Sequence, residues 1–93
     1  MFISQVIFES DVENREAMER IMKKKKEDSK DAEGMLSSEC WWKEDTKTVG
    51  FSIITKWKDR EYFKTWMKET HKGGHKKAEM DIKKTVYQFQ ETE

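Results

Sequence analysis

Residues 48–66 read TVGFSIITKWKDREYFKTW, and the spacing of their apolar side chains changes midway. Up to residue 57 the apolar positions alternate, as in a strand with one buried face. That face would carry Val49, Phe51, Ile53 and Trp57. Beyond Asp59, a residue type that often caps helices, apolar pairs recur four residues apart at 62–63 and 66–67. The stretch therefore predicts a strand that leads directly into an amphipathic helix.

The residues before this stretch predict a second strand that pairs with the first. Residues 35–42 alternate in the same way, and the polar sequence KEDTK at 43–47 is typical of a turn. One face of this strand would carry Leu36, Ser38, Cys40 and Trp42. The opposite face would carry Ser37, Glu39 and Trp41. Together the two strands form a predicted β-hairpin.

Two more strands and another helix are predicted toward the ends of the chain. The β-branched and aromatic residues of 2–8 and 84–91 favour strands. Apolar side chains within 17–22 fall on one helical face, and Ser10 or Asp11 is the expected cap of that helix. The element order along the chain is therefore β-α-β-β-α-β.

This order predicts the α+β class and a ferredoxin-like fold, in which two helices cover one face of a four-stranded antiparallel sheet. The chain has 93 residues and is expected to form a single domain, residues 1–93. Aromatic and β-branched residues occur on both faces of the predicted strands, so the second face should also be covered. The same sheet of a second subunit is the simplest cover, and we expect a homodimer.

Composition argues against several kinds of partner. The 19 basic and 19 acidic side chains cancel, so no net charge directs the protein to nucleic acid. The basic run Lys23–Lys26 is followed by acids and is interpreted as a solvated helix end. No apolar run approaches the ~20 residues that span a bilayer, and the start of the chain lacks signal-peptide features. The single cysteine, Cys40, agrees with a reducing compartment, so the protein is expected to be cytoplasmic and not membrane-bound.

Both histidines lie in the sequence WMKETHKGGHKK. His71 and His75 are four residues apart, but Gly73-Gly74 is expected to end the helix between them, which argues against a zinc site on one helical face. A cationic imidazole at a helix C-terminus is the plain alternative for either histidine. Cys40 is interpreted as a buried, unreactive thiol. The four tryptophans are core or interface residues by default, although indoles near a histidine would also suit a flat aromatic ligand.

The sequence ITKWKDREYFKTWMKETHKGGHKK, residues 54–77, resembles a segment of the antibiotic biosynthesis monooxygenase superfamily. That segment has a tryptophan at the end of a strand, a second tryptophan after eight intervening residues, a short spacer, and then A-H-K or G-H-K. AEGM at 32–35 is likewise similar to the x-x-G-F that opens the second strand in that superfamily. Taken with the element order, the resemblance covers essentially the whole chain. The branch that it resembles most is the IsdG-type heme-degrading monooxygenases.

The resemblance implies a dimeric α+β barrel of two subunits packed sheet to sheet, with a site in each subunit between the sheet and the helices. It implies heme as both substrate and cofactor, with O₂ and a reductant consumed and iron released. By position in the motif, His75 would be the axial ligand of the heme iron, with His71 as the alternative. Trp66 would contact the porphyrin as a catalytic residue, and Trp57 and Phe63 would join it in binding the cofactor.

The first strand departs from the family pattern, which has an asparagine near the iron-bound oxygen. Val6 or Ile7 occupies that place here, and Gln5 is the nearest amide, so Gln5 is the candidate for the catalytic polar group. Ligand binding and oxygen activation depend on different residues, so heme could bind without being degraded. Two alternatives remain open. One is a cofactor-independent monooxygenase acting on quinols or polycyclic aromatic compounds, and the other is a non-enzymatic dimeric module that binds a small ligand.

Overall fold

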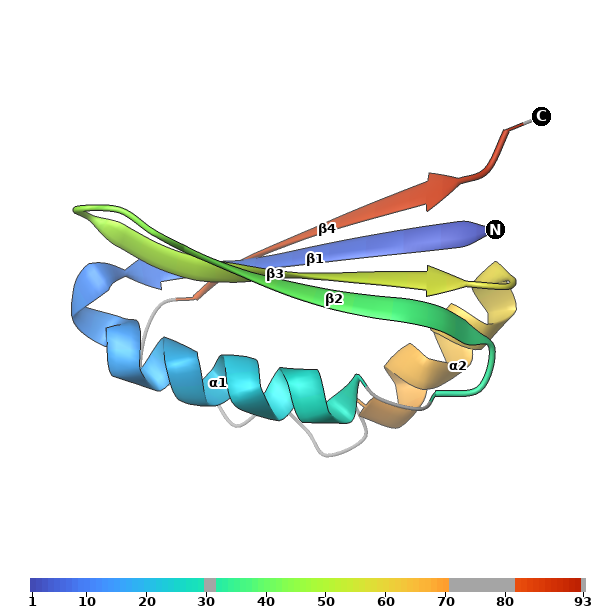
Figure 1. Cartoon of the computed structure of the whole chain (residues 1–93), viewed down its shortest axis with the longest axis horizontal. Coiled ribbons are helices and arrows are strands. Elements are labelled where there is room, and N and C mark those ends of the chain that lie inside the picture. Colours follow the sequence, from blue (N-terminus) through green and yellow to red (C-terminus); the bar gives the residue numbers. More distant parts are fainter. Residues whose placement is uncertain (30–31, 71–81, 93) are drawn as a thin grey trace.

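The computed structural model describes residues 1–29, 32–70 and 82–92. Its elements, in chain order, are β1 (Phe2–Asp11), the short 3-10 helix η1 (Val12–Asn14), α1 (Arg15–Asp28), β2 (Met35–Glu44), β3 (Thr48–Trp57), α2 (Arg60–Thr70) and β4 (Lys83–Gln90). Both helices lie against the same face of the sheet (Figure 1). The predicted β-α-β-β-α-β order and ferredoxin-like fold are therefore confirmed. No helix among the described residues is long and apolar enough to cross a membrane.

The sheet has the strand order β2-β3-β1-β4, so β1 and β3 occupy its centre. Every pairing is antiparallel, and the register sets Val6 opposite Ile53 on one side and opposite Val86 on the other. Cross-strand neighbours of this kind lie on the same face of a sheet. The register thus assembles rows of side chains that face the helices, separated by rows that face away.

The start of α1 differs from the prediction. Ser10 and Asp11 belong to β1, where they pair with β3, and η1 intervenes before α1 begins. Pairing in the sheet holds both residues extended, so neither can cap α1. Ser10 instead accepts a hydrogen bond on its Oγ from Nδ2 of Asn14, at 2.9 Å. Asn14 stands at the N-cap of α1 and makes no side-chain capping bond there.

The predicted face of Leu36 is also wrong. The register of β2 against β3 shifts between Met35 and Ser37, which leaves Leu36 as the extra residue of a β-bulge. Met35 packs against buried residues, whereas Leu36 is exposed. Beyond the bulge, Cys40 and Trp42 pack toward the helices as expected.

The loop before β2 contains the one glycine with a positive φ among the described residues, Gly34 at 81°. A Cβ at Gly34 would clash with the ring of Tyr62 in α2, so a larger residue would require that ring to move. The carbonyl of Gly34 also accepts a hydrogen bond from the backbone N–H of Lys58, at 2.9 Å. This glycine therefore joins the start of β2 to the start of α2.

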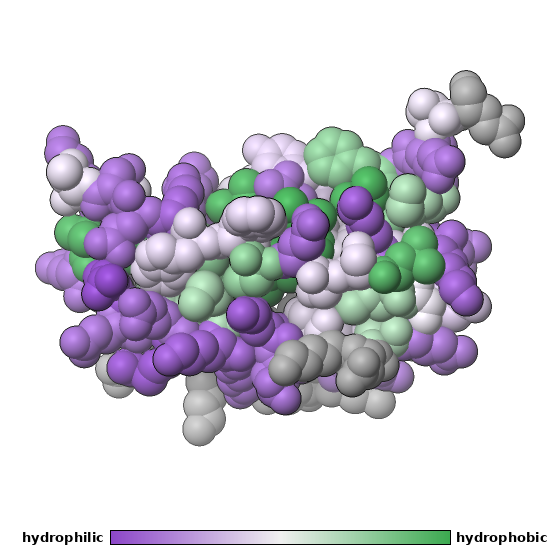
Figure 2. Space-filling model, in the orientation of Figure 1, coloured by the Kyte–Doolittle hydropathy of each residue, from purple (hydrophilic) through white to green (hydrophobic). Residues whose placement is uncertain are grey.

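Two groups of buried side chains fill the space between the sheet and the helices. The first core lies under α1 and consists of Val6, Phe8, Met18, Val49, Phe51 and Ile53. The second core lies at the α2 end and consists of Phe2, Trp57 and Phe63, with Trp66 and Met67 packed against it. Burial of these apolar surfaces is the main force that holds the helices to the sheet. The exposed side of α1 is hydrophilic (Figure 2).

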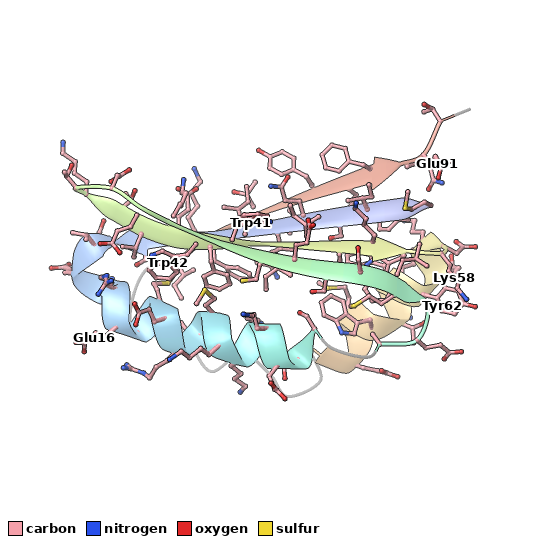
Figure 3. All side chains as sticks on the ribbon, viewed as in Figure 1. Glu16, Trp41, Trp42, Lys58, Tyr62 and Glu91 are labelled. Carbon is pink, nitrogen blue, oxygen red and sulfur yellow. The ribbon has the colours of Figure 1, made fainter. Side chains whose placement is uncertain are left out.

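The opposite face of the sheet, here called the outer face, is covered by neither α1 nor α2, the two α-helices of the described residues (Figure 1). Its exposed aromatic side chains are Trp41 (62 % exposed), Tyr87 (47 %) and Phe89 (50 %). Trp41 and Trp42 point to opposite sides of β2, with Trp42 on the side of α1 (Figure 3). The outer face thus contains apolar surface that a single chain leaves exposed to solvent.

Polar pairs also lie on the outer face. Nζ of Lys43 is 2.9 Å from Oε2 of Glu9, and both residues are paired in the register with Gly50, which lies between them. Since Gly50 has no side chain, the two long side chains can meet across β3. Nε2 of Gln5 donates a hydrogen bond to Oγ of Ser52, at 3.2 Å. Aromatic and polar side chains are therefore mixed on this face.

Candidate functional site

A pocket opens on the helix side of the sheet, where the two cores meet. Its described walls come from β1, β3, β4 and both helices. They consist of Val6, Phe8, Lys25, Asp28, Ser29, Ile53, Thr55, Trp66, Met67 and Lys84. The cavity volume is about 40 Å³, and the lining is mostly apolar. A volume of this size holds one or two water molecules, so a larger ligand would place only an edge in it.

Trp66 is the tryptophan that lines the pocket, and contacts on two sides set its orientation. Its ring centre lies 5.4 Å from that of Trp57, at an interplanar angle of 46°. Its Nε1–H donates a hydrogen bond to the backbone carbonyl of Asp28, at 3.3 Å. Asp28 is the last residue of α1, so Trp66 links α2 to the end of α1. The structure thus places Trp66 in a pocket wall, and its contact with a ligand there stays a prediction.

Trp57 and Phe63 lie behind Trp66 and do not appear among the described pocket walls. Trp57 is fully buried, and its Nε1–H donates to Oγ1 of Thr55, at 2.8 Å. The rings of Trp57 and Phe63 meet edge to face, with centres 5.9 Å apart, a favourable geometry for aromatic pairs. Both residues were expected to bind the cofactor. In this arrangement they support the ring of Trp66 from behind.

The structure does not bring Gln5 to the pocket, which corrects its assignment as the catalytic polar group. Gln5 lies on the outer face, bonded to Ser52, while its neighbour Val6 lines the pocket from β1. Successive residues of a strand point to opposite faces, so Gln5 and Val6 cannot both face the helices. Ile7, the other residue considered for this place, shares the outer face with Gln5. Among the described pocket walls no amide side chain is present.

His71 and His75 lie outside the described residues, so their role as iron ligands stays a prediction. Within the described ranges, no group of three or more histidine, cysteine or acidic side chains could hold a metal ion. Cys40 is half-buried, and burial raises the pKa of its thiol, an effect that the nearby Lys26 opposes. A protonated thiol is a poor nucleophile, in agreement with the interpretation of Cys40 as unreactive.

Sequence reasoning missed two lysines in the pocket wall. Nζ of Lys25, from α1, lies 5.7 Å from the ring centre of Phe8, and Nζ of Lys84, from β4, lies 5.9 Å from it. Lys25 belongs to the basic run that was interpreted as solvated, and for this residue the interpretation is wrong because it is half-buried. Its position gave a signal: residue 25 follows the apolar residues Met18 and Met22 by seven and three positions, on the inward stripe of α1.

One buried hydroxyl near the pocket has no hydrogen-bond partner among the described residues. Ser4 is 1 % exposed, and its Oγ is unpaired. Ser4 is paired in the register with Thr55, which lines the pocket. Leaving a buried hydroxyl unsatisfied costs about 1–3 kcal/mol. A bound molecule that reached Ser4 would remove this cost.

Comparison with solved structures shows the same fold in other proteins. One is the heme-degrader MhuD from Mycobacterium tuberculosis with two hemes bound in its active site, at 14 % identity and a TM-score of 0.67 over 96 % of this chain and 93 % of that one. A point mutant of MhuD, with two manganese protoporphyrin IX molecules per active site, gives a TM-score of 0.70 at 14 % identity over 97 % and 93 %. No protein-family model and no curated protein sequence matches the chain.

Two further structures show how far this likeness extends. An antibiotic biosynthesis monooxygenase of unproven activity from Bacillus cereus has a TM-score of 0.57 at 19 % identity, over 99 % of this chain and 95 % of that chain. The de novo designed protein Foldit4 has a TM-score of 0.59 at 12 % identity, over 98 % of each chain. A designed protein can share the fold without sharing a chemistry, so the fold does not specify the reaction. The resemblance found in the sequence is thus confirmed for the fold: the chain is folded like the antibiotic biosynthesis monooxygenases and the heme-degrader MhuD.

Proposed function

We propose that the protein binds heme on the helix side of its sheet and degrades it as an O₂- and reductant-dependent monooxygenase. The observation that carries the proposal is the place of Trp66. The second tryptophan of the motif forms a wall of an apolar pocket between the sheet and the helices. Support comes from the heme degrader MhuD, because its fold matches 96 % of the length of the present chain.

The described pocket walls fit one edge of a porphyrin. Heme is a flat, apolar ring that carries two carboxylate groups. The pocket offers an indole and apolar side chains for the ring, and the ammonium groups of Lys25 and Lys84 for an anion. Heme would supply redox-active iron, and His75 is the proposed axial ligand with His71 as the alternative. The residues present are therefore compatible with this cofactor.

In such a reaction, the protein's own residues would bind the ligand, fix its orientation and exclude water from the pocket. Trp66 presents a ring whose tilt is set by Trp57 and by the carbonyl of Asp28. A flat ligand held against it would adopt a defined orientation, and a fixed orientation lowers the entropic part of a reaction barrier. Val6 and Ile53 exclude water from the sheet side of the pocket.

A homodimer belongs to the same proposal. The exposed aromatic side chains of the outer face, Trp41, Tyr87 and Phe89, lie on the side that neither helix covers. A second copy packed sheet to sheet would bury them, as the dimeric barrel requires, and would leave each pocket on the helix side of its own subunit. The proposed compartment of the enzyme is the cytoplasm.

Titration of the apo-protein with hemin, followed by absorbance in the Soret and visible bands, tests the proposal. We expect saturation at one heme per chain, and we expect His75→Ala to alter the spectrum of the bound heme, with His71→Ala as the matched control. Ascorbate added in air should then cause the Soret band to decay. Unchanged heme spectra in both histidine variants would contradict axial ligation by either residue.

One observation favours a second candidate, the cofactor-independent monooxygenase. Val6 or Ile7 occupies the position from which the family presents an asparagine, and Val6, the one that lines the pocket, is apolar. The pocket therefore lacks, among its described walls, the amide expected beside iron-bound oxygen. If hemin fails to saturate while quinones quench the tryptophan fluorescence of the protein, the second candidate replaces the first.

A further inference from the structure

Lys25 and Lys84 approach one aromatic ring from two different elements. Their Nζ atoms lie 5.7 and 5.9 Å from the centre of the Phe8 ring, and all three residues line the pocket. Phe8 is itself held in place by Phe51, whose ring stacks on it at a centre distance of 4.9 Å. The two cations therefore flank a fixed apolar surface at one end of the pocket.

Two like charges beside an apolar surface are unfavourable without an anion. The pKa of Lys25 is lowered, first by burial and then by the charge of Lys84. Asp28 opposes this shift and also lines the pocket, but no ion pair joins it to either lysine among the described residues. The neighbouring Lys24 adds further positive charge. Among the described residues, Asp28 thus offsets the charge of Lys25 only in part, and no carboxylate is paired with either lysine.

We infer that Lys25 and Lys84 form a subsite for the carboxylate groups of the ligand. The substrate class of the pocket is then a flat aromatic acid, and not a neutral quinol or hydrocarbon. A carboxylate bound at either ammonium group would form charge-assisted hydrogen bonds and offset the mutual repulsion of the two lysines. This inference rests on the proposed function only in that the pocket accepts a flat aromatic ring, and it does not depend on ligation of iron.

Metal-free protoporphyrin IX and its dimethyl ester provide the test. The two molecules share one ring, but only the first has free carboxylates, and neither needs an axial ligand. Their affinities would be measured by tryptophan quenching, in the same detergent, for the unsubstituted protein, Lys25→Gln, Lys84→Gln and the double variant. Lys23→Gln, at an exposed position of α1, and Lys83→Gln, on the outer-face side of β4, are the matched controls.

The double variant should bind the free acid at least about tenfold more weakly, the size of effect expected for lost charge-assisted contacts. Its affinity for the ester should change by less than about twofold, and the controls should bind both molecules like the unsubstituted protein. Added salt should weaken binding of the acid more than binding of the ester, because exposed charges are screened. The apo form of the double variant should melt at the same temperature or higher, since the repulsion is gone, which separates lost binding from lost folding.

Equal affinity of the double variant and the unsubstituted protein for the free acid would overturn the inference and leave the heme proposal standing. Weaker binding of acid and ester alike would also overturn it, because the lysines would then act on the ring or the fold. If the unsubstituted protein bound neither porphyrin, the subsite would fail, and the hemin titration would separately decide the heme proposal. Binding of the free acid could depend on the two lysines while the spectrum of bound hemin is unchanged in His75→Ala. The carboxylate subsite would then be supported, and iron ligation by His75 would be contradicted.

Discussion

Trp41 and Trp42 are adjacent in the chain, yet they belong to two different environments. Trp42 packs against the first core on the helix side, and its Nε1–H donates to Glu44. Trp41 lies on the outer face and is the more exposed of the two (Figure 3). The two faces of this sheet therefore differ in how they are covered. The helices of the same chain cover one face, and the other contains aromatic side chains that those helices do not cover.

The difference between the two faces in covering and in polar groups indicates which kind of contact each face favours. On the helix side, the two cores leave a mostly apolar pocket between them, and the charged residues in its described walls are Lys25, Asp28 and Lys84. On the outer face, Glu9 pairs with Lys43 and Gln5 pairs with Ser52, so polar groups that accompany the aromatic side chains are already satisfied within the chain. Satisfied polar groups can be buried at lower cost. The outer face is therefore suited to association and the helix side to ligand binding.

The largest expected effect follows from removing a side chain on the helix side. Trp57→Ala should lower the free energy of unfolding by about 3–5 kcal/mol, because it leaves a cavity in the second core and removes the donor to Thr55. Small domains have only about 5–15 kcal/mol in total, so a large unfolded fraction is expected. Chemical denaturation followed by circular dichroism at fixed protein concentration measures the change.

Trp41→Ala is the matched control for that experiment, since it removes the same ring from the outer face. Under conditions where the chain is monomeric, it should lower the free energy of unfolding by less than about 1 kcal/mol. Equal losses for Trp57→Ala and Trp41→Ala would mean that the two faces do not differ in the way described.

The next effect concerns association. Trp41→Ser should weaken the proposed dimer at least about tenfold, as expected for an exposed aromatic residue that the interface would bury. Sedimentation equilibrium gives the dissociation constant, and an unchanged circular dichroism spectrum would show that the fold is kept. Lys24→Ser on the exposed side of α1 should leave association unaltered. A monodisperse monomer of the unsubstituted chain at micromolar concentration would count against sheet-to-sheet pairing altogether.

The smallest effect is expected at the hairpin turn, which belongs to neither face. Oδ1 of Asp45 accepts hydrogen bonds from the backbone N–H groups of Lys47 and Thr48, both at 2.8 Å, and these bonds lower the pKa of its carboxyl group. The pKa is thus lower in the folded than in the unfolded chain. The resulting stability is present above the unfolded value of about 4 and is lost as the pH falls through the folded value.

Asp45→Asn should therefore lower the melting temperature slightly at pH 7, and the difference from the unsubstituted protein should shrink toward pH 3. Calorimetry at both pH values measures it. If the difference in melting temperature were the same at pH 7 and pH 3, the charge of the Asp45 carboxylate would not contribute to stability.

Sequence periodicity predicted the elements well and the roles of single side chains less well. The strands and helices followed from alternation and from apolar pairs four residues apart, and Asp59 does accept a hydrogen bond from the backbone N–H of Glu61 at the start of α2, at 3.3 Å. In residues 2–8, however, both faces carry apolar side chains, so alternation alone could not tell which face meets the helices. The register against β3 decides it, and that register sends Gln5 outward and Val6 inward.

Local charge was misleading for a similar reason. Lys25 lies in a run of four lysines, three of which are exposed, and composition treats all four alike. Its burial depends on where α1 crosses β1, which is a tertiary feature. For Trp66 the local sequence was informative. The two tryptophans of the motif, nine residues apart, marked it as a site residue, and the structure places it in the pocket wall.

The bulge at Leu36 also affects how this protein avoids uncontrolled aggregation. β2 and β4 are the two edges of the sheet, and an open edge can template further strands from other molecules. The bulge interrupts the pairing pattern near one end of β2, and β4 begins with Lys83 and Lys84, whose charges repel a like strand. With both edges made poor templates, growth by strand addition is disfavoured, and it would compete little with the proposed pairing through the outer face.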